Sequence, residues 1–188
     1  MNSYELNQIA EIITGYTFRT AIENSIDGNY KVIQAKDVSD DLEVDDSNLT
    51  KINLEKFNTN ALTKKNDILL TSRGRYQAAI FTSSNQTIAS SSIFIIRVTN
   101  QKINPHYLAI FLNSRHGQIQ LEKNTSGNYI KSIPKFNLEN LIIQVPSINE
   151  QIKIINLYKN IKNQQRLLKR KMEIISNISE NSLIKILN

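Results

Sequence analysis

Apolar and polar residues follow two different patterns along this chain of 188 residues. Before about position 100, apolar residues form short β-branched runs bounded by Asn, Asp, Ser and Gly, which is typical of strands. These runs predict strands at residues 30–35, 67–72, 77–82 and 92–98, with a further one at 6–13. The segment 37–46 is acidic and poor in apolar residues, so we expect a loop there.

After position 100 the apolar residues recur at helical spacing. Asn104 followed by Pro105 predicts a helix start, because Asn caps a helix and Pro fits its first turn. Tyr107, Leu108, Phe111 and Leu112 would form one apolar face of this helix. A second short helix is predicted at 114–124 with Ile119 and Leu121 buried, and an extended segment at 138–145.

The last forty residues predict one long helix. Residues 148–187 contain neither Gly nor Pro, and Ser147 with Glu150 three positions later forms a capping-box pattern. At 1.5 Å per residue such a helix is about 60 Å long. Its apolar positions give a heptad seam, which indicates a coiled coil. The seam positions are Ile154, Tyr158, Ile161, Gln165, Leu168, Met172, Ile175, Ser179 and Ile186, with Gln151 at its start and Ser182 near its end.

These patterns predict a mixed α/β globular domain over residues 1–146 and a long coiled-coil helix over 147–188. Further apolar residues beside the seam widen it beyond what a two-stranded coiled coil needs, so we expect the helix to contact more than one partner. Polar residues within a seam, such as Gln165, favour one register.

Charge is distributed unevenly. Residues 1–100 contain ten Lys/Arg and twelve Asp/Glu, whereas residues 101–188 contain thirteen and five. A basic half of this kind indicates either a polyanionic partner such as nucleic acid or a solvated basic helix face.

The motifs of several enzyme classes are missing. The sequence has no Cys, no phosphate-binding or dinucleotide-binding glycine loop, and two His that are not spaced as a metal pair. The segment 104–107 is similar to the Asn-Pro-Pro-Tyr motif of amino-methyltransferases, but the helix start explains it better. We therefore predict no catalytic residues and no metal site. With no secretion signal or membrane-spanning run, we expect a cytoplasmic protein.

Five segments, in order, resemble type I restriction–modification specificity (S) subunits. The junction Ile142-Ile143-Gln144-Val145-Pro146-Ser147-Ile148-Asn149-Glu150-Gln151 is similar to the family's I-x-[IV]-P-x-[LI]-x-E-Q, which joins a target recognition domain to a conserved coiled-coil helix. The others are 15–19, similar to G-[YF]-x-F-[RK]; 30–38, similar to the strand that follows; 66–74, similar to G-D-I-L-[ILV]-[ST]-x-x-G; and 127–133, similar to G-[ST]-x-[IQ]-x-x-[IL].

The chain departs from the family's pattern at two positions and in length. Asn66 stands where the family has Gly, and Asn128 where it has Ser or Thr. Complete S subunits have two recognition domain–helix units in tandem, whereas this chain has one. It thus resembles a half subunit, and the resemblance implies that two copies pair antiparallel with two-fold symmetry.

The resemblance also implies function. Two recognition domains held apart by paired helices would read a bipartite, palindromic double-stranded DNA site. Methyltransferase (M) subunits would carry S-adenosylmethionine, so this chain would bind no cofactor itself, and a restriction (R) subunit would join through them.

Base reading needs Arg, Asn or Gln, and phosphate binding needs Lys, Arg and hydroxyls. Two segments and two isolated residues offer these groups: Arg73, Arg75, Tyr76, Gln77; Lys123, Asn124, Thr125, Ser126, Asn128, Tyr129, Lys131; and Arg19 and Lys36. Alternatively, Arg75 and Tyr76 cap a hairpin and the second segment is a polar linker. Tyr16 and Phe18 are predicted to belong to the core.

Three other interpretations stay open. The chain could be a coiled-coil interaction protein that reads no DNA, a decoy half subunit that competes for methyltransferase, or one half of a longer S subunit.

Overall fold

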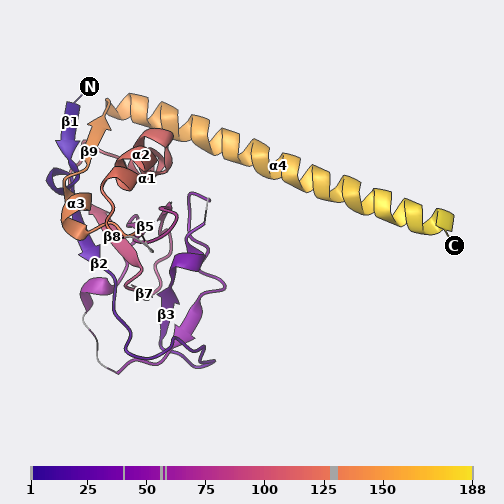
Figure 1. Cartoon of the computed structure of the whole chain (residues 1–188), viewed down its shortest axis with the longest axis horizontal. Helices are drawn as coiled ribbons and strands as arrows, with labels where there is room; N and C mark the ends of the chain where they lie inside the picture. The colour runs from indigo at the N-terminus through magenta and orange to yellow at the C-terminus, as the bar shows by residue number, and fades with distance from the viewer. Residues whose placement is uncertain (1, 40, 56, 58, 128–130, 188) are drawn as a thin grey trace. The chain divides into compact units, whose positions relative to one another are not determined.

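The computed structural model describes residues 2–39, 41–55, 57, 59–127 and 131–187, without the side chains of 181–187. The chain divides into two compact units, Met1–Ile152 and Lys153–Asn188. The first is a mixed α/β domain and the second is the main part of one long helix, as the sequence predicts (Figure 1). No helix among the described residues is long and apolar enough to span a membrane.

The domain contains three small sheets. A four-stranded antiparallel sheet has the order β2-β8-β5-β6, a three-stranded one has β4-β3-β7, and β1 pairs with β9. In Figure 1 this last pair joins the two ends of the domain's chain. The strands are β1 (Asn2–Glu5), β2 (Ala10–Thr14), β3 (Tyr30–Ile33), β4 (Thr50–Ile52), β5 (Ile68–Thr71), β6 (Ala78–Ile80), β7 (Thr87–Ala89), β8 (Ile93–Val98) and β9 (Ile142–Val145).

The predicted strands at 30–35, 67–72, 77–82 and 92–98 are confirmed as β3, β5, β6 and β8. The strand predicted at 6–13 is confirmed only in its second half, as part of β2. A 3-10 helix at Leu6–Gln8 takes the place of its first half and separates β2 from β1, so that Leu6 and Ile9 are both buried. The strands β4 and β7 were missed because each has three residues and, unlike β6, is not part of a longer apolar run. Two further 3-10 turns are Ala35–Asp37 and Thr59–Ala61.

The central strand β5 is buried along its whole length. Alternate residues of a strand face opposite sides of the sheet. Leu69 accordingly joins an apolar cluster with Ile33 of β3, Ile95 of β8, and Phe81, which directly follows β6. Helix α1 (Pro105–Asn113) contacts β5 and β6. Complete burial of each large apolar side chain contributes roughly 1.5–3 kcal/mol, so this cluster is a main source of stability.

The helices agree with the sequence in part. Asn104 caps α1 by accepting a hydrogen bond from the His106 amide, and Ser114 caps α2 (Arg115–Lys123). Leu121 is buried as predicted, but Ile119 is 42% exposed. Two positions differ by about 200° around a helix, so the two side chains point to different sides. The extended segment predicted at 138–145 begins instead inside α3 (Lys135–Glu139) and only then becomes β9.

The turn before β5 explains one departure from the family's pattern. Asn66 has a φ of 72°, the left-handed conformation that Gly adopts freely and Asn tolerates better than most residues. Its neighbour Asp67 is 2% exposed and accepts two hydrogen bonds from Arg97, at 2.9 and 2.7 Å. The Asp67 carboxylate raises the pKa of the Arg97 guanidinium. The Asn-Asp pair is therefore structural.

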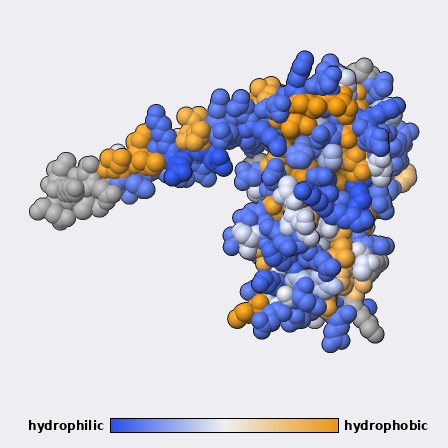
Figure 2. Space-filling model, turned by 180° about the vertical axis from the view of Figure 1, so that it is seen from behind, coloured by the Kyte–Doolittle hydropathy of each residue, from blue (hydrophilic) through white to orange (hydrophobic). Residues whose placement is uncertain are grey.

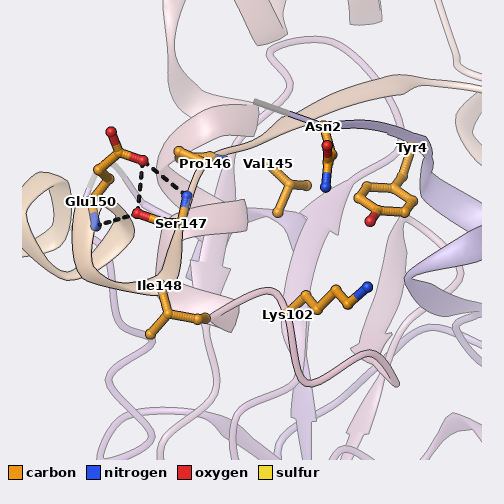
Figure 3. Close-up of a pocket in the computed structure, with 8 residues that line it drawn as sticks. All are labelled: Asn2, Tyr4, Lys102, Val145, Pro146, Ser147, Ile148 and Glu150. Atoms are coloured by element: carbon orange, nitrogen blue, oxygen red, sulfur yellow. Dashed lines mark hydrogen bonds between the residues drawn. The ribbon is translucent and has the colours of Figure 1, made fainter.

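The long helix α4 (Ile148–Leu187) begins with the predicted capping box. The Ser147 amide and hydroxyl both donate to Glu150 Oε2, at 2.9 and 2.8 Å, while the Glu150 amide donates to Ser147 Oγ at 3.4 Å. Figure 3 shows this pair at a pocket that Tyr4 and Lys102 also line. The Ser147 and Glu150 side chains thus satisfy backbone amides at the start of the helix that have no partner within it.

Gln151 was expected to begin the coiled-coil seam, and this expectation is wrong. Its side chain is completely buried inside the domain. Its Oε1 accepts a hydrogen bond from the Asn104 amide at 2.8 Å, and its Nε2 donates to the carbonyls of Lys102 and Pro146 at 2.8 and 2.9 Å. Gln151 thus connects the start of α4 to the loop before α1, and the domain's contacts continue beyond Pro146 to Ile152.

We predict that Gln151→Leu lowers the free energy of unfolding of the domain by about 2–4 kcal/mol, because three backbone groups lose their partner. Urea unfolding measures this loss. Gln164→Leu, the same change at an exposed position of α4, is the control and should alter stability by less than about 0.5 kcal/mol. Equal effects of the two substitutions would contradict the structural role of Gln151.

Candidate nucleic-acid interface

The two segments predicted to contact DNA lie side by side. The loop between β5 and β6 pairs with residues 131–133: the Gly74 amide donates to the Lys131 carbonyl at 3.3 Å, and the Ile133 amide donates to the Ser72 carbonyl at 3.1 Å. Ser132 also exchanges two backbone hydrogen bonds with Ser126, at 2.9 and 3.0 Å. We call the surface formed by the exposed side chains within residues 72–77, 123–127 and 131–133 the paired-loop surface.

The β5–β6 loop has a fixed shape that exposes two arginines. Thr71 Oγ1 donates to the Arg75 carbonyl at 2.7 Å and accepts from the Gln77 amide at 2.9 Å. Gly74 has a φ of 71°, in the left-handed region that favours Gly. The side chains of Arg73 and Arg75 are exposed on this loop, whereas Gln77 is half-buried.

In the second segment, some predicted contact residues have local structural roles. Asn124 Nδ2 donates to the Gln120 carbonyl at 2.8 Å, and Thr125 Oγ1 donates to the Glu122 carbonyl at 2.9 Å. Both side chains therefore terminate α2, because they satisfy carbonyls of its last turn. Lys123, Ser126 and Lys131 are exposed. Asn128 and Tyr129 lie outside the described residues.

Tyr76 was predicted to contact DNA, but its side chain does not lie on the surface. Tyr76 is 4% exposed, and its backbone carbonyl accepts a hydrogen bond from Gln118 Nε2 at 2.8 Å. Burial, with a smaller contribution from the charge of Glu122, raises the pKa of the Tyr76 hydroxyl. The Tyr76 ring is thus buried between the exposed Arg75 and the half-buried Gln77.

Arg19 and Lys36 belong to a neighbouring surface. Lys36 lines a groove with Thr20, and Arg19 is exposed in the same loop as Thr20. The groove's other lining residues are Phe18, Ala21, Ile22, Gln34, Ala35, Ser90, Ser91 and Ser92. The Ser72 amide donates to the Ser92 carbonyl at 2.8 Å, so the groove adjoins the paired-loop surface.

Sequence reasoning missed the serines of this groove. Ser90 and Ser92 share a hydrogen bond between their hydroxyls of 2.8 Å, and both line the groove together with Ser91. Hydroxyl groups contact phosphate oxygens in many protein–DNA interfaces. The run of three serines between β7 and β8 was the available signal, but serine runs are also common in plain turns.

The predicted aromatic residues pack against one another. The rings of Tyr16 and Phe18 meet edge to face with centroids 4.8 Å apart, and Phe57 adds contacts to Tyr16 and Tyr30. Tyr16 and Phe18 were predicted to belong to the core, but both are half-buried, so they pack against each other outside the buried core.

The charge and geometry of the paired-loop surface favour binding of an anion. Four exposed cations lie on it, Arg73, Arg75, Lys123 and Lys131, and Glu122 is the exposed acid next to them. A guanidinium can donate two parallel hydrogen bonds to guanine or to a phosphate. Among the described residues no group of three or more His, Asp or Glu is placed to hold a metal ion.

Comparison with solved structures shows the fold. A chain from a structure on complex assembly and conformational transition of the type I R-M system matches with a TM-score of 0.68 at 19% identity over 90% of this chain. The HsdS subunit from Thermoanaerobacter tengcongensis gives 0.64 at 19% over 90%, and the type I restriction–modification S subunit from M. genitalium gives 0.61 at 17% over 92%. This chain spans 40%, 39% and 42% of those three chains, respectively.

The sequence itself matches a family model described as the type I restriction modification DNA specificity domain, over residues 1–177. The match includes the whole α/β domain and most of α4, so it extends over both units of the structure. The chain therefore belongs to the family of type I restriction–modification DNA specificity domains.

Proposed function

We propose that this chain is the sequence-reading, non-catalytic subunit of a type I restriction–modification system and binds one half of a bipartite DNA site. The observation that supports this most is the pairing of the two predicted DNA-contact segments into one surface with four exposed cations. Backbone hydrogen bonds hold the loops, so the backbone that carries these side chains is in place before DNA binds. Such pre-organisation lowers the cost of binding.

Within this surface the residues have different proposed roles. Arg73 and Arg75 extend from a rigid turn and are suited to read guanine edges in the major groove. Lys123 and Lys131 are suited to bind phosphates and fix the orientation of the domain. The serine-lined groove with Lys36 and Arg19 would extend the phosphate contacts.

The second part of the proposal is dimerisation through α4. The seam residues Ile154, Ile161, Leu168, Met172 and Ile175 are between 38% and 72% exposed in the single chain. Burial of this stripe against a second copy would remove apolar surface from water, at about 25 cal/mol per Å². Two copies packed antiparallel would place two identical readers at the two ends, and the helix length would set the spacing of the half sites.

The third part is recruitment of methyltransferase subunits, which would carry S-adenosylmethionine and, in turn, bind the restriction subunit. Apolar residues outside the seam support a further protein contact: Leu157, Leu167, Ile174 and Ile178 are 49–63% exposed. Figure 2 shows apolar patches between hydrophilic ones along the described part of this helix. A helix with only one partner would not need a second apolar stripe.

The identity of the base read by Arg73 can be tested with the full chain and its co-encoded methyltransferase. Duplexes selected from random sequence define the site, and each base pair is then varied in competition assays. Arg73→Ala should reduce discrimination by about 1–3 kcal/mol at one base pair in each half site. Arg115→Ala, an exposed arginine at the other end of α2, is the control and should leave the preference unchanged. A uniform loss across all sequences would show that Arg73 binds phosphate instead.

Two neighbouring leucines separate dimerisation from recruitment. Leu168 lies in the seam, and Leu167 lies about 100° away, with 61% and 57% of their side chains exposed. Leu168→Glu should convert the dimer to a monomer in sedimentation experiments. Leu167→Glu should leave the dimer intact and weaken association with the methyltransferase by at least about tenfold, the equivalent of about 1.4 kcal/mol. A wild-type chain that is monomeric at micromolar concentration would contradict the dimer.

A further inference from the structure

Basic residues gather on one side of α4. Residues 153–172 contain seven Lys or Arg and no Asp or Glu. Successive residues of an α-helix are about 100° apart, so five of the seven fall within one third of the circumference. These five form the basic flank: Lys159, Lys162, Arg166, Lys169 and Arg170. All of them are exposed except Lys162, which is half-buried with its ammonium group 5.7 Å from the centre of the Tyr158 ring.

The seam and the two flanks divide the helix surface into three strips. With Tyr158 and Gln165 at heptad position a, the seam occupies positions a and d. The basic flank then occupies b, e and f on one side of the seam. Leu157, Leu167, Ile174 and Ile178 occupy c and g on the other side, and we call this strip the apolar flank.

Two-fold symmetry brings equal flanks together. In an antiparallel pair of identical helices the dyad is perpendicular to the plane that contains both helices. A strip on one side of that plane in one copy is therefore on the same side in the other copy. The dimer would have one basic side, with ten cations from two copies, and one apolar side.

From this segregation we infer that the basic flank binds the phosphate backbone of the unread DNA between the two half sites, while the apolar flank receives the methyltransferase. The inference rests on the proposed function. We take the partner to be DNA because the flank carries positive charge along about 18 Å of helix, the length of its twelve residues. Duplex DNA carries one negative charge per about 1.7 Å and so matches an extended basic strip.

Acidic residues on the same side of the helix reduce the positive charge of this strip but do not neutralise it. Glu173 and Glu180 lie on the same side beyond Arg170, which leaves a net charge of +3 per copy on this strip. In the dimer Lys162 and Lys169, at position e, would approach the same residues of the second copy. Like charges that face each other destabilise a pair, and a bound polyanion would remove this repulsion. The alternative is that the cations pair with Glu173 of the second copy or with an acidic protein.

The test compares two double variants that remove the same charge. Arg166→Gln with Lys169→Gln changes the basic flank, and Lys153→Gln with Lys171→Gln changes positions c and g. Glutamine is a good helix former, so α4 should persist in both. Affinity for the selected duplex is measured against salt concentration, together with the preference for correct half sites. A plot of the logarithm of the binding constant against the logarithm of salt concentration should be less steep for the flank variant, with a slope smaller in magnitude by about 3–4. The reason is that a dimer loses four cations, each of which contributes about 0.9 to the slope. The control should lose less than about 1.

A second measurement locates the contact. Methylphosphonate groups, which carry no charge, replace the phosphates of the spacer only. This change should weaken binding of the wild type and of the control variant by at least about tenfold, and should hardly affect the flank variant. Half-site preference should stay the same throughout, because the spacer is not read.

The outcomes distinguish this inference from the proposed function. Equal salt slopes for the two variants, or a wild type indifferent to the neutral spacer, would overturn the inference. A flank variant that forms a weaker dimer but responds to the neutral spacer as the wild type does would assign the cations to Glu173 of the second copy. If the wild type shows no half-site preference for any duplex, the proposed function itself fails.

Discussion

Residues 72–74 and 131–133 are almost sixty positions apart in the chain, and backbone hydrogen bonds hold them together. The proposed DNA-binding surface depends on this pairing, because each segment alone is an irregular loop with too few apolar residues to pack. Thr71 fixes the first loop from inside, and Ile133, 3% exposed, anchors the second in the core. Arginines on loops fixed in this way lose less conformational entropy on binding than arginines on mobile loops.

Helix α4 follows a different principle, because most of its described side chains beyond the first turns are exposed and form strips at the helical period. A heptad seam, a basic flank and an apolar flank each recur with nearly the same period but at different phase. The capping box and the Gln151 contacts fix the beginning of the helix. The remainder exposes residues that a soluble monomer would bury or replace, and such a surface marks an interaction site.

The sequence predicted the features that depend on local pattern. The capping box at Ser147, the Asn104 cap and the strands β3, β5, β6 and β8 follow from neighbouring residues, and the structure confirms them. Strand β7, with only two apolar residues, and the break at Leu6–Gln8 depend on tertiary contacts, so pattern alone could not show them. The seven-residue period wrongly assigned Gln151 to the seam, because the tertiary contacts that bury its side chain in the domain leave no mark on the period. Periodicity identifies a face of a helix but not the partner that covers it.

The candidate site shows the same limit. Pattern identified the loops that converge, yet it could not separate Arg75, which is exposed, from Tyr76, which is buried. It also could not show that Asn124 and Thr125 serve α2, because their polar groups suit a cap and a DNA contact equally well. Composition indicates which chemistry a segment offers, and only the fold decides which side chains remain available.

Separation of sequence reading from phosphate binding gives the proposed architecture a physical advantage. Phosphate contacts add affinity without discrimination, whereas base contacts on the paired-loop surface add both. If the basic flank supplied much of the affinity through a spacer of any sequence, the readers would need few base contacts each, and one mismatched half site would still remove about 1–3 kcal/mol per base pair. Because the two flanks of α4 lie on opposite sides of the seam, DNA and methyltransferase would then bind the same helix pair without competing for its surface.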